Sequence, residues 1–137
     1  MFFGLIFLSF STFDPEPLIS NHVRYFLWLP LLILGLGAAT YLSNALGWKN
    51  AHGEKGGLMV TGWYRWSRNP VYVVSCVGMI GWGMFVNSGY VSVILALWGF
   101  MYLLSPYVEE PWLESCYGEE YRDYKMKVPR FIGFPSA

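Results

Sequence analysis

The sequence predicts an all-α, polytopic integral membrane protein. We expect three transmembrane helices, a possible short N-terminal one, and a C-terminal amphipathic helix on the cytoplasmic side. Hydrophobic residues make up 55% of the 137 residues and charged residues only 13%, about half the charged fraction of an ordinary soluble domain. Three long uncharged runs follow one another along the chain. The formal net charge is zero, which excludes a nucleic-acid-binding protein that uses a broad basic surface.

The first element is a short apolar segment, FFGLIFLSFSTF, at the N-terminus. It covers about 12 residues, which is too short to cross a bilayer upright. It also lacks the basic start and the small-residue cleavage site of a signal peptide. We therefore expect a short or tilted helix, with an interfacial segment as the alternative.

The second element is the run at residues 25–48, which contains no charged residue. At 1.5 Å per residue, a helix of this length crosses a hydrocarbon core of about 30 Å. Pro30 lies in its first turns, where it costs little or kinks the helix. Small residues give the helix a flat side for close packing against another helix. They are Gly35, Gly37, Ala38 and Ala39. The polar stretch at residues 49–57 is predicted to be a loop.

Two further uncharged runs, at residues 71–86 and 90–108, are separated only by Asn87-Ser88-Gly89, residues typical of a tight turn. So short a connection predicts an antiparallel hairpin. Asn69 and Pro70 can begin the first run, because Asn caps free backbone amides and Pro suits the first helical position. With this extension the first run reaches roughly 18 residues, the usual lower limit for a span.

Basic residues lie on both flanks of the predicted hairpin and none lies in its turn. By the positive-inside rule, both flanks face the cytoplasm and the turn faces away. The same rule places the loop at residues 14–21 outside. The basic residues before the hairpin are Lys49, Lys55, Arg65 and Arg68, and those after it are Arg122, Lys125, Lys127 and Arg130.

The last element is an amphipathic helix at residues 111–125, outside the bilayer. Its apolar residues recur at steps of three and four, and Pro129 would stop it. They are Leu113, Tyr117, Tyr121, Tyr124 and Val128. This helix either lies on the membrane surface or covers a site.

The hairpin brings polar residues from both of its ends to one mouth. Arg68 stands just before a helix start, where its guanidinium and the free amides of the first turn could bind an anion. Glu109 and Glu110 return to the same mouth. A structural ion pair explains this placement, and so does a binding site. Aromatic walls, a carboxylate and an anion site suit S-adenosylmethionine, which has a planar ring, a cationic part and a carboxylate. Nicotinamide dinucleotides usually come with a glycine fingerprint, which the sequence lacks.

Three motifs follow one another along roughly the C-terminal 75 residues. They are Gly62-x-Tyr64-x-x-x-Arg68-Asn69-Pro70-x-Tyr72, then Glu109-Glu110-x-x-Leu113, and then Tyr117-Gly118-x-x-Tyr121-x-x-Tyr124-x-x-x-Val128-Pro129-Arg130. In this order and spacing they resemble the integral-membrane methyltransferases of the isoprenylcysteine carboxyl methyltransferase and phospholipid methyltransferase superfamily.

The resemblance implies methyl transfer from S-adenosylmethionine to a membrane-partitioned acceptor, such as an isoprenylcysteine-type carboxylate. The cofactor would bind at the cytoplasmic ends of the last helices, beneath the C-terminal segment, and the substrate would enter sideways from the bilayer. The implied catalytic residues are Arg68 and Glu110, and no metal is expected. The implied cofactor-binding residues are Tyr64, Arg68, Asn69, Pro70, Tyr72, Glu109, Glu110, Tyr121, Tyr124 and Arg130.

Residues 1–137 would then form a single membrane-embedded methyltransferase domain. Residues 1–48 would be its N-terminal helices, and residues 58–137 its cofactor-binding hairpin and C-terminal lid. The expected partners are membrane lipids and a lipophilic or lipid substrate, and no nucleic acid. If a second copy supplies the front of the substrate tunnel, the protein is a homo-oligomer. The active site and the C-terminus would face the cytoplasm, in the cell inner membrane or the endoplasmic reticulum.

Three alternative interpretations stay open at this point. A phospholipid N-methyltransferase has an amine acceptor that must lose a proton, which Glu109 or Glu110 could accept. An NADPH-dependent membrane sterol-type reductase also ends in a Tyr-rich helix followed by Val-Pro, but the Arg-Asn-Pro-x-Tyr step argues against it. A non-enzymatic small membrane protein is the third alternative. A proton-coupled pump is disfavoured, because each long run is uncharged through its middle.

Overall fold

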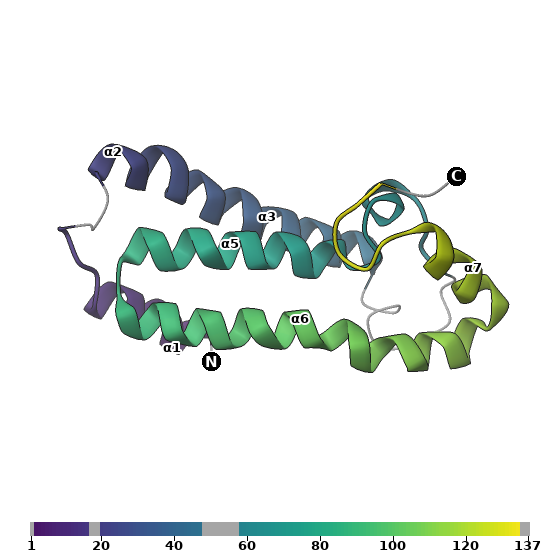
Figure 1. Cartoon of the computed structure of the whole chain (residues 1–137). Helices are drawn as coiled ribbons and strands as arrows, with labels where there is room; N and C mark the ends of the chain where they lie inside the picture. Colours follow the sequence, from purple (N-terminus) through teal and green to yellow (C-terminus); the bar gives the residue numbers. More distant parts are fainter. Residues whose placement is uncertain (1, 17–19, 48–57, 135–137) are drawn as a thin grey trace.

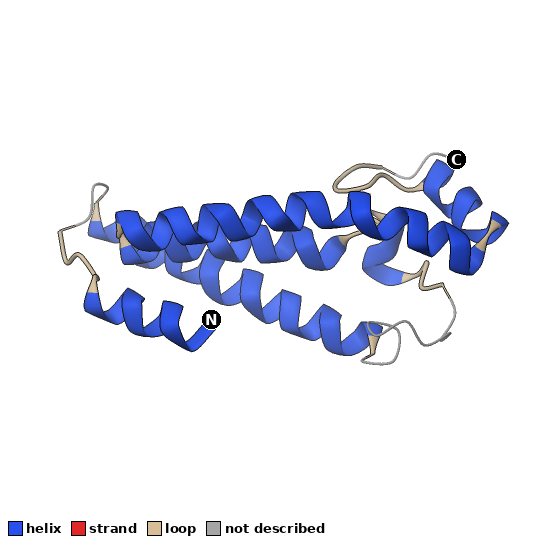
Figure 2. Cartoon of the chain, turned by 90° about the horizontal axis from the view of Figure 1, so that it is seen from below, coloured by secondary structure: helices blue, strands red, loops and turns tan. Residues whose placement is uncertain are grey.

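The structure is a computed structural model that describes residues 2–16, 20–47 and 58–134, and all regular secondary structure in these residues is helical (Figures 1 and 2). The elements are α1 (Phe2–Ser11), α2 (Asn21–Val23), η1 (Arg24–Trp28), α3 (Leu29–Leu46), η2 (Gly62–Arg65), α5 (Pro70–Val86), α6 (Gly89–Tyr117) and α7 (Glu119–Lys127). α2, the π-helical turn η1 and α3 follow one another without a break and form one continuous helix. The predicted loop at residues 49–57 lies outside the described residues.

The long helices lie side by side in an elongated bundle (Figure 1). The predicted hairpin is confirmed: α5 and α6 are antiparallel, and Asn87 takes the left-handed conformation, with φ of 56°, in the turn between them. Within the described residues, two helices are long and apolar enough to cross a membrane, Asn21–Ala45 and Gly89–Tyr117, whereas α5 has 17 residues. Two of the three predicted spans therefore meet the length criterion, and a span by α5 stays a prediction.

The N-terminal segment is helical, as predicted, and packs near the turn of the hairpin. Its Leu5 and Ser9 are buried. The indole Nε1 of Trp82 on α5 donates a hydrogen bond of 2.9 Å to Ser9 Oγ, and Thr12 Oγ1 donates one of 2.8 Å to Ser88 Oγ. With 10 residues α1 is about 15 Å long, which is half the thickness of a hydrocarbon core.

Glycines allow α3 and α5 to pack with their backbones in contact. A Cβ built on Gly35 would lie 2.4 Å from the backbone nitrogen of Gly78, and one built on Gly81 would lie 2.5 Å from that of Leu32. Of the predicted flat side of α3, Gly35 is therefore at the contact. Gly37 is not, because a Cβ there would meet nothing within 4 Å.

The second helix begins earlier than predicted and includes a charged residue. It starts at Asn21 rather than at position 25, so Arg24 lies inside it with an exposed fraction of 1%. The guanidinium donates hydrogen bonds of 2.6 Å to the carbonyl of Phe85 and 3.2 Å to that of Val86. These carbonyls end α5, where a helix has unpaired acceptors and partial negative charge, and they make the buried charge tolerable.

The predicted C-terminal helix at residues 111–125 is wrong in its boundaries. α6 continues through Pro106 and Pro111 to Tyr117, and the helix ends at Gly118, whose φ is 56°. A proline removes one hydrogen bond of a helix, and packing can hold the helix through it; Pro106 is fully buried. The predicted apolar face is nevertheless confirmed, because all of its members gather in one cluster. That cluster contains Tyr121, Tyr124, Val128, Leu58, Tyr64, Leu113 and Tyr117.

Candidate functional site

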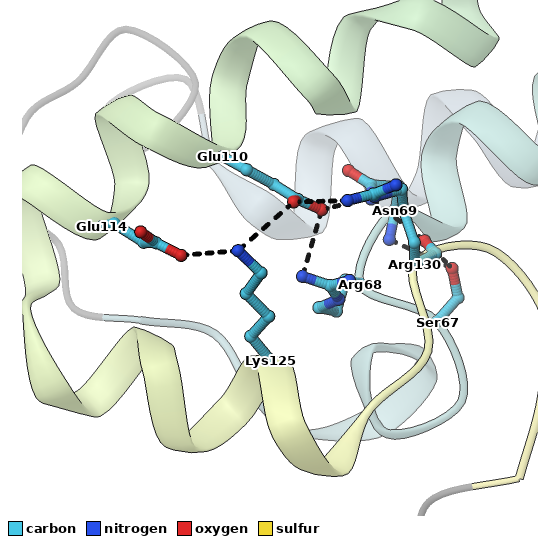
Figure 3. Close-up of polar contacts among 7 residues, drawn as sticks. All are labelled: Ser67, Arg68, Asn69, Glu110, Glu114, Lys125 and Arg130. Atoms are coloured by element: carbon cyan, nitrogen blue, oxygen red, sulfur yellow. Dashed lines mark hydrogen bonds and ion pairs between the residues drawn. The ribbon is translucent and has the colours of Figure 1, made fainter.

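A buried carboxylate, Glu110 of α6, forms the centre of an ion-pair network at the end of the bundle where α5 begins (Figure 3). Glu110 is 5% exposed. Arg130 grips it with two hydrogen bonds, from Nε to Oε1 at 2.7 Å and from Nη2 to Oε2 at 2.8 Å. Arg68 Nη1 lies 3.0 Å from Oε1, and Lys125 Nζ lies 3.8 Å from Oε2. The predicted meeting of Arg68 with the glutamates is therefore confirmed for Glu110.

The network carries an excess of positive charge. Three cations, Arg68, Lys125 and Arg130, face two carboxylates, because Lys125 also pairs with Glu114 at 2.6 Å. The hydrogen bond with Glu110 raises the pKa of Arg130, and the one with Glu114 raises the pKa of Lys125. The cations beside Glu110 favour its ionised form.

Arg68 has hydrogen-bonding capacity that the described residues do not use. Its side chain is only 8% exposed, yet no hydrogen-bond acceptor in residues 2–16, 20–47 or 58–134 pairs with Nε or Nη1. Nη1 is close to Glu110 but is not aligned for a hydrogen bond. Buried guanidinium donors are costly to leave unpaired, and they suit a carboxylate ligand.

The segment after α7, residues 128–134, crosses over the start of α5, and we call it the C-terminal strap. The backbone N–H of Arg68 donates to the carbonyl of Pro129 at 3.0 Å, and Asn69 Nδ2 donates to the carbonyl of Arg130, also at 3.0 Å. Ser67 Oγ lies 3.5 Å from the same carbonyl. The strap and the residues before α5 therefore hold each other in place.

Asn69 and Pro70 begin α5 differently from the expectation. Pro70 occupies the first turn, as predicted, and is buried. Asn69 is the N-cap residue, but its side chain makes no capping hydrogen bond. That prediction is wrong because the carboxamide donates to the strap instead.

The second glutamate, Glu109, belongs to a separate cluster. The hydroxyl of Tyr72 on α5 donates a hydrogen bond to Glu109 Oε1. The ring of Tyr72 lies 5.0 Å from that of Tyr102, which in turn lies 6.2 Å from the ring of Trp98. Glu109 is exposed, in contrast to Glu110.

The remaining predicted site residues are tyrosines that pack α7 against η2. Tyr121 is 2% exposed, and Tyr124 donates a hydrogen bond of 2.7 Å to the carbonyl of Tyr64. Burial raises the pKa of all three phenols. In this structure they form the small core beneath the strap, and cofactor binding by them stays a prediction.

Sequence reasoning did not place two members of the network at the site: Glu114 was not among the predicted site residues, and Lys125 was counted only among the basic residues that flank the hairpin. Glu114 lies four residues after Glu110, so both project from the same face of α6. A continuous helix through Pro111 would have revealed this spacing, and the expected break at the proline concealed it.

The sequence of this region is similar to that of known proteins. Residues 23–120 match the sequence model of the phospholipid methyltransferase family. The chain belongs to this family. The matched region contains the Arg68-Asn69-Pro70-x-Tyr72 segment and both glutamates. Family membership and the long apolar helices together support a membrane-bound methyltransferase.

One curated relative is the cobalt-zinc-cadmium resistance protein CzcN of Cupriavidus metallidurans. The chain is 31% identical to it over 128 residues, which cover 88% of this chain and 59% of that protein. The chain thus spans about three fifths of this relative's length. No solved structure matches the chain.

Proposed function

We propose that the protein transfers a methyl group from S-adenosylmethionine to a lipophilic acceptor that reaches the site from the bilayer. The observation that carries the proposal is the buried Arg68 guanidinium with two unused donors, in a network with one excess positive charge. Such a group would bind the carboxylate of the cofactor's methionine part. The family match supports the same reaction class.

Glu110 would orient Arg68 and Arg130 rather than act as a proton acceptor, because three cations hold it in its ionised form. Of these cations Lys125 lies farthest from Glu110, at 3.8 Å and with a side chain 38% exposed, and it keeps a second carboxylate partner in Glu114. The ammonium group of the cofactor would take its place beside Glu110 Oε2. The strap would then cover the bound cofactor, since Asn69 and Arg130 fix it across the start of α5.

S-adenosylmethionine supplies an electrophilic methyl group on a positively charged sulfur. The acceptor's nucleophilic atom would bond to this methyl carbon, and the electron pair of the broken carbon–sulfur bond would stay on sulfur. The residues of this chain have to align the two partners and exclude water. A carboxylate acceptor needs nothing further, whereas an amine acceptor must also lose a proton.

Placement in the membrane follows from the same proposal. The ion-pair network would face the cytoplasm, where the soluble cofactor is available, and the hairpin turn would face the opposite side. The lipophilic part of the acceptor would stay among the apolar side chains of the long helices. This orientation agrees with the basic residues near the start of α5 and in α7.

The test is equilibrium binding of S-adenosylmethionine to the detergent-purified chain, with NADPH as the comparison ligand. We expect saturable binding of S-adenosylmethionine and at least a tenfold loss of affinity in Arg68→Ala. The matched control is Arg65→Ala, because Arg65 is exposed and lies three residues earlier. Its affinity should equal that of the wild type. Absence of saturable binding at sub-millimolar cofactor, or equal losses in both variants, would refute the proposal.

A further inference from the structure

We propose that the C-terminal strap lies on the cytoplasmic surface of the bilayer, and that its contact with lipid holds the cofactor site closed. Four exposed apolar side chains make this contact, and we call them the interfacial anchor. They are Trp63 and Trp66 before α5, and Ile132 and Phe134 in the strap. The link to the cofactor rests on the proposed function, whereas the position of the strap can be measured without it.

The interfacial anchor is apolar and yet exposed. Each of its four side chains is more than half exposed, and Phe134 reaches 87%. Trp63 and Trp66 are three residues apart at the 3₁₀ turn η2, and this spacing places them on the same side of the turn. The rings of Trp66 and Phe134 meet edge to face, with 5.7 Å between their centroids, so the anchor joins the strap to the segment before α5.

The length of α5 places the interfacial anchor at the depth of the lipid headgroups. α5 has 17 residues and is about 25 Å long, whereas a hydrocarbon core is about 30 Å thick. With the hairpin turn at the far boundary of this core, the segment before α5 lies at the near boundary. Figure 1 shows the strap beside the start of α5, while α6 extends farther, to α7. Tryptophan is enriched at this depth, because its ring is apolar and its N–H is polar.

The charge beside the interfacial anchor favours a lipid surface as its partner. Arg65 is exposed between the two tryptophans in sequence, and within the described ranges no carboxylate oxygen lies within 4.0 Å of its guanidinium. At this depth a guanidinium binds lipid phosphates, and the cytoplasmic leaflet is rich in anionic lipids. A partner protein would have to displace these lipids first. Micelles of a detergent without phosphate offer Arg65 no such ligand, so Arg65→Ala remains neutral there.

The strap connects the interfacial anchor to the proposed cofactor site. Phe134 lies four residues after Arg130, whose guanidinium holds Glu110. The backbone N–H of Arg68 donates to the carbonyl of Pro129 in the same strap. Lipid that holds Phe134 in place therefore restrains both arginines. Because a strap fixed in advance loses less conformational entropy when the cofactor binds, lipid contact should raise the affinity for the cofactor, and bound cofactor should in turn strengthen lipid contact.

Spin labelling measures the position of the strap. The chain is reconstituted in nanodiscs of phosphatidylcholine and phosphatidylglycerol, with the free cysteines Cys76 and Cys116 replaced by alanine. One variant is labelled at Ile132→Cys, and a reference variant at Asp123→Cys, on the exposed side of α7. We expect the label at position 132 to be accessible to oxygen and shielded from an aqueous nickel chelate, and the label at position 123 to show the reverse. Chelate access as high at position 132 as at 123 would overturn the inference.

Equilibrium binding of S-adenosylmethionine in the same nanodiscs measures the coupling. Phe134→Ala should lower the affinity about fivefold or more, as is usual for coupled sites. Phe134→Leu should keep most of the affinity, because it retains an apolar side chain for the lipid while losing the ring contact with Trp66. The matched control is Tyr90→Ala, which removes an exposed aromatic side chain at the opposite end of α6 and should bind as the wild type does.

Each other outcome overturns the inference. Unchanged affinity in Phe134→Ala, or an equal loss in Tyr90→Ala, would remove the coupling. A loss in Phe134→Leu as large as that in Phe134→Ala would assign the effect to the ring contact rather than to lipid. Dimers that form in the wild type and are lost in Phe134→Ala would make a second copy the occupant of this surface. These results leave the proposed function standing. Absence of cofactor binding to the wild type refutes the proposed function, and the label at position 132 still decides where the strap lies.

Discussion

Substituting Gly35 by alanine should separate α3 from α5. The new Cβ would lie 2.4 and 2.5 Å from the backbone nitrogen and Cα of Gly78, and 2.9 Å from the carbonyl oxygen of Val74. None of these atoms can rotate away, because all belong to the backbone of α5. An ordinary Cβ contact needs at least about 3.4 Å, so the helices must move apart by close to 1 Å.

The magnitude follows from two opposing effects. Overpacking a closely packed contact costs about 1 to 3 kcal/mol, and backbone-to-backbone overlap puts Gly35→Ala at the upper end. Replacing glycine by alanine inside a helix returns about 1 kcal/mol. The net loss is therefore about 2 kcal/mol. Gly37→Ala, two residues along the same helix, has open space and should keep the gain of about 1 kcal/mol.

The assay is thermal unfolding of both variants in the same detergent, followed by circular dichroism. For a chain of this size, 1 kcal/mol corresponds to roughly 4 °C, so Gly35→Ala should melt about 8 °C below the wild type and Gly37→Ala about 4 °C above it. The opposite signs of the two shifts carry the argument. If both variants change in the same direction by the same amount, α3 and α5 are not in backbone contact at Gly35.

Two further predictions concern the two ends of the bundle. Replacing Arg24 by methionine leaves the carbonyls of Phe85 and Val86 without their charged donor and should cost about 3 kcal/mol or more, with Arg24→Lys recovering part of the loss in thermal melts. An Arg24→Met protein as stable as the wild type would show that these bonds contribute nothing. Burial raises the pKa of Tyr124, so the unfolded chain releases this proton first and stability should fall as the pH rises above 10.0. Tyr124→Phe loses the bond to Tyr64, about 1 kcal/mol at neutral pH, and should melt with a shallower alkaline decline; an unchanged decline would assign it to other groups.

Topology made much of this arrangement predictable from the sequence. A three-residue turn between two long uncharged runs forces their outer ends together, and this alone brings Arg68 to Glu110. The apolar periodicity of the C-terminal region likewise identified Tyr121 and Tyr124 as neighbours of Leu113. Both inferences use constraints that act within the chain itself, chain connectivity and helical period.

The errors came from local rules that tertiary contacts override. The second helix was predicted to begin at residue 25, where the uncharged run begins, yet the helix also includes Arg24, because carbonyls of α5, 61 and 62 residues away, accept hydrogen bonds from its guanidinium. Pro111 was expected to begin a helix, whereas α6 passes through it and ends at Gly118. Asn69 was expected to cap α5 with its side chain, but its carboxamide donates a hydrogen bond to the carbonyl of Arg130 in the C-terminal strap instead.

The continuous course of α6 also explains why adjacent glutamates can have unlike environments. Successive residues of an α-helix project about 100° apart, so Glu109 and Glu110 cannot face the same neighbours. A break at this point would have let both side chains turn toward the arginines. Because the helix continues to Tyr117, Glu110 points to Arg130 and Lys125, while Glu109 meets Tyr72. The helical continuation through Pro111 is thus the structural condition for two adjacent carboxylates with different neighbours. Glu110→Gln, which alters the contacts of Arg68 and Arg130, should weaken cofactor binding more than Glu109→Gln, and equal losses of affinity in the two variants would contradict this reasoning.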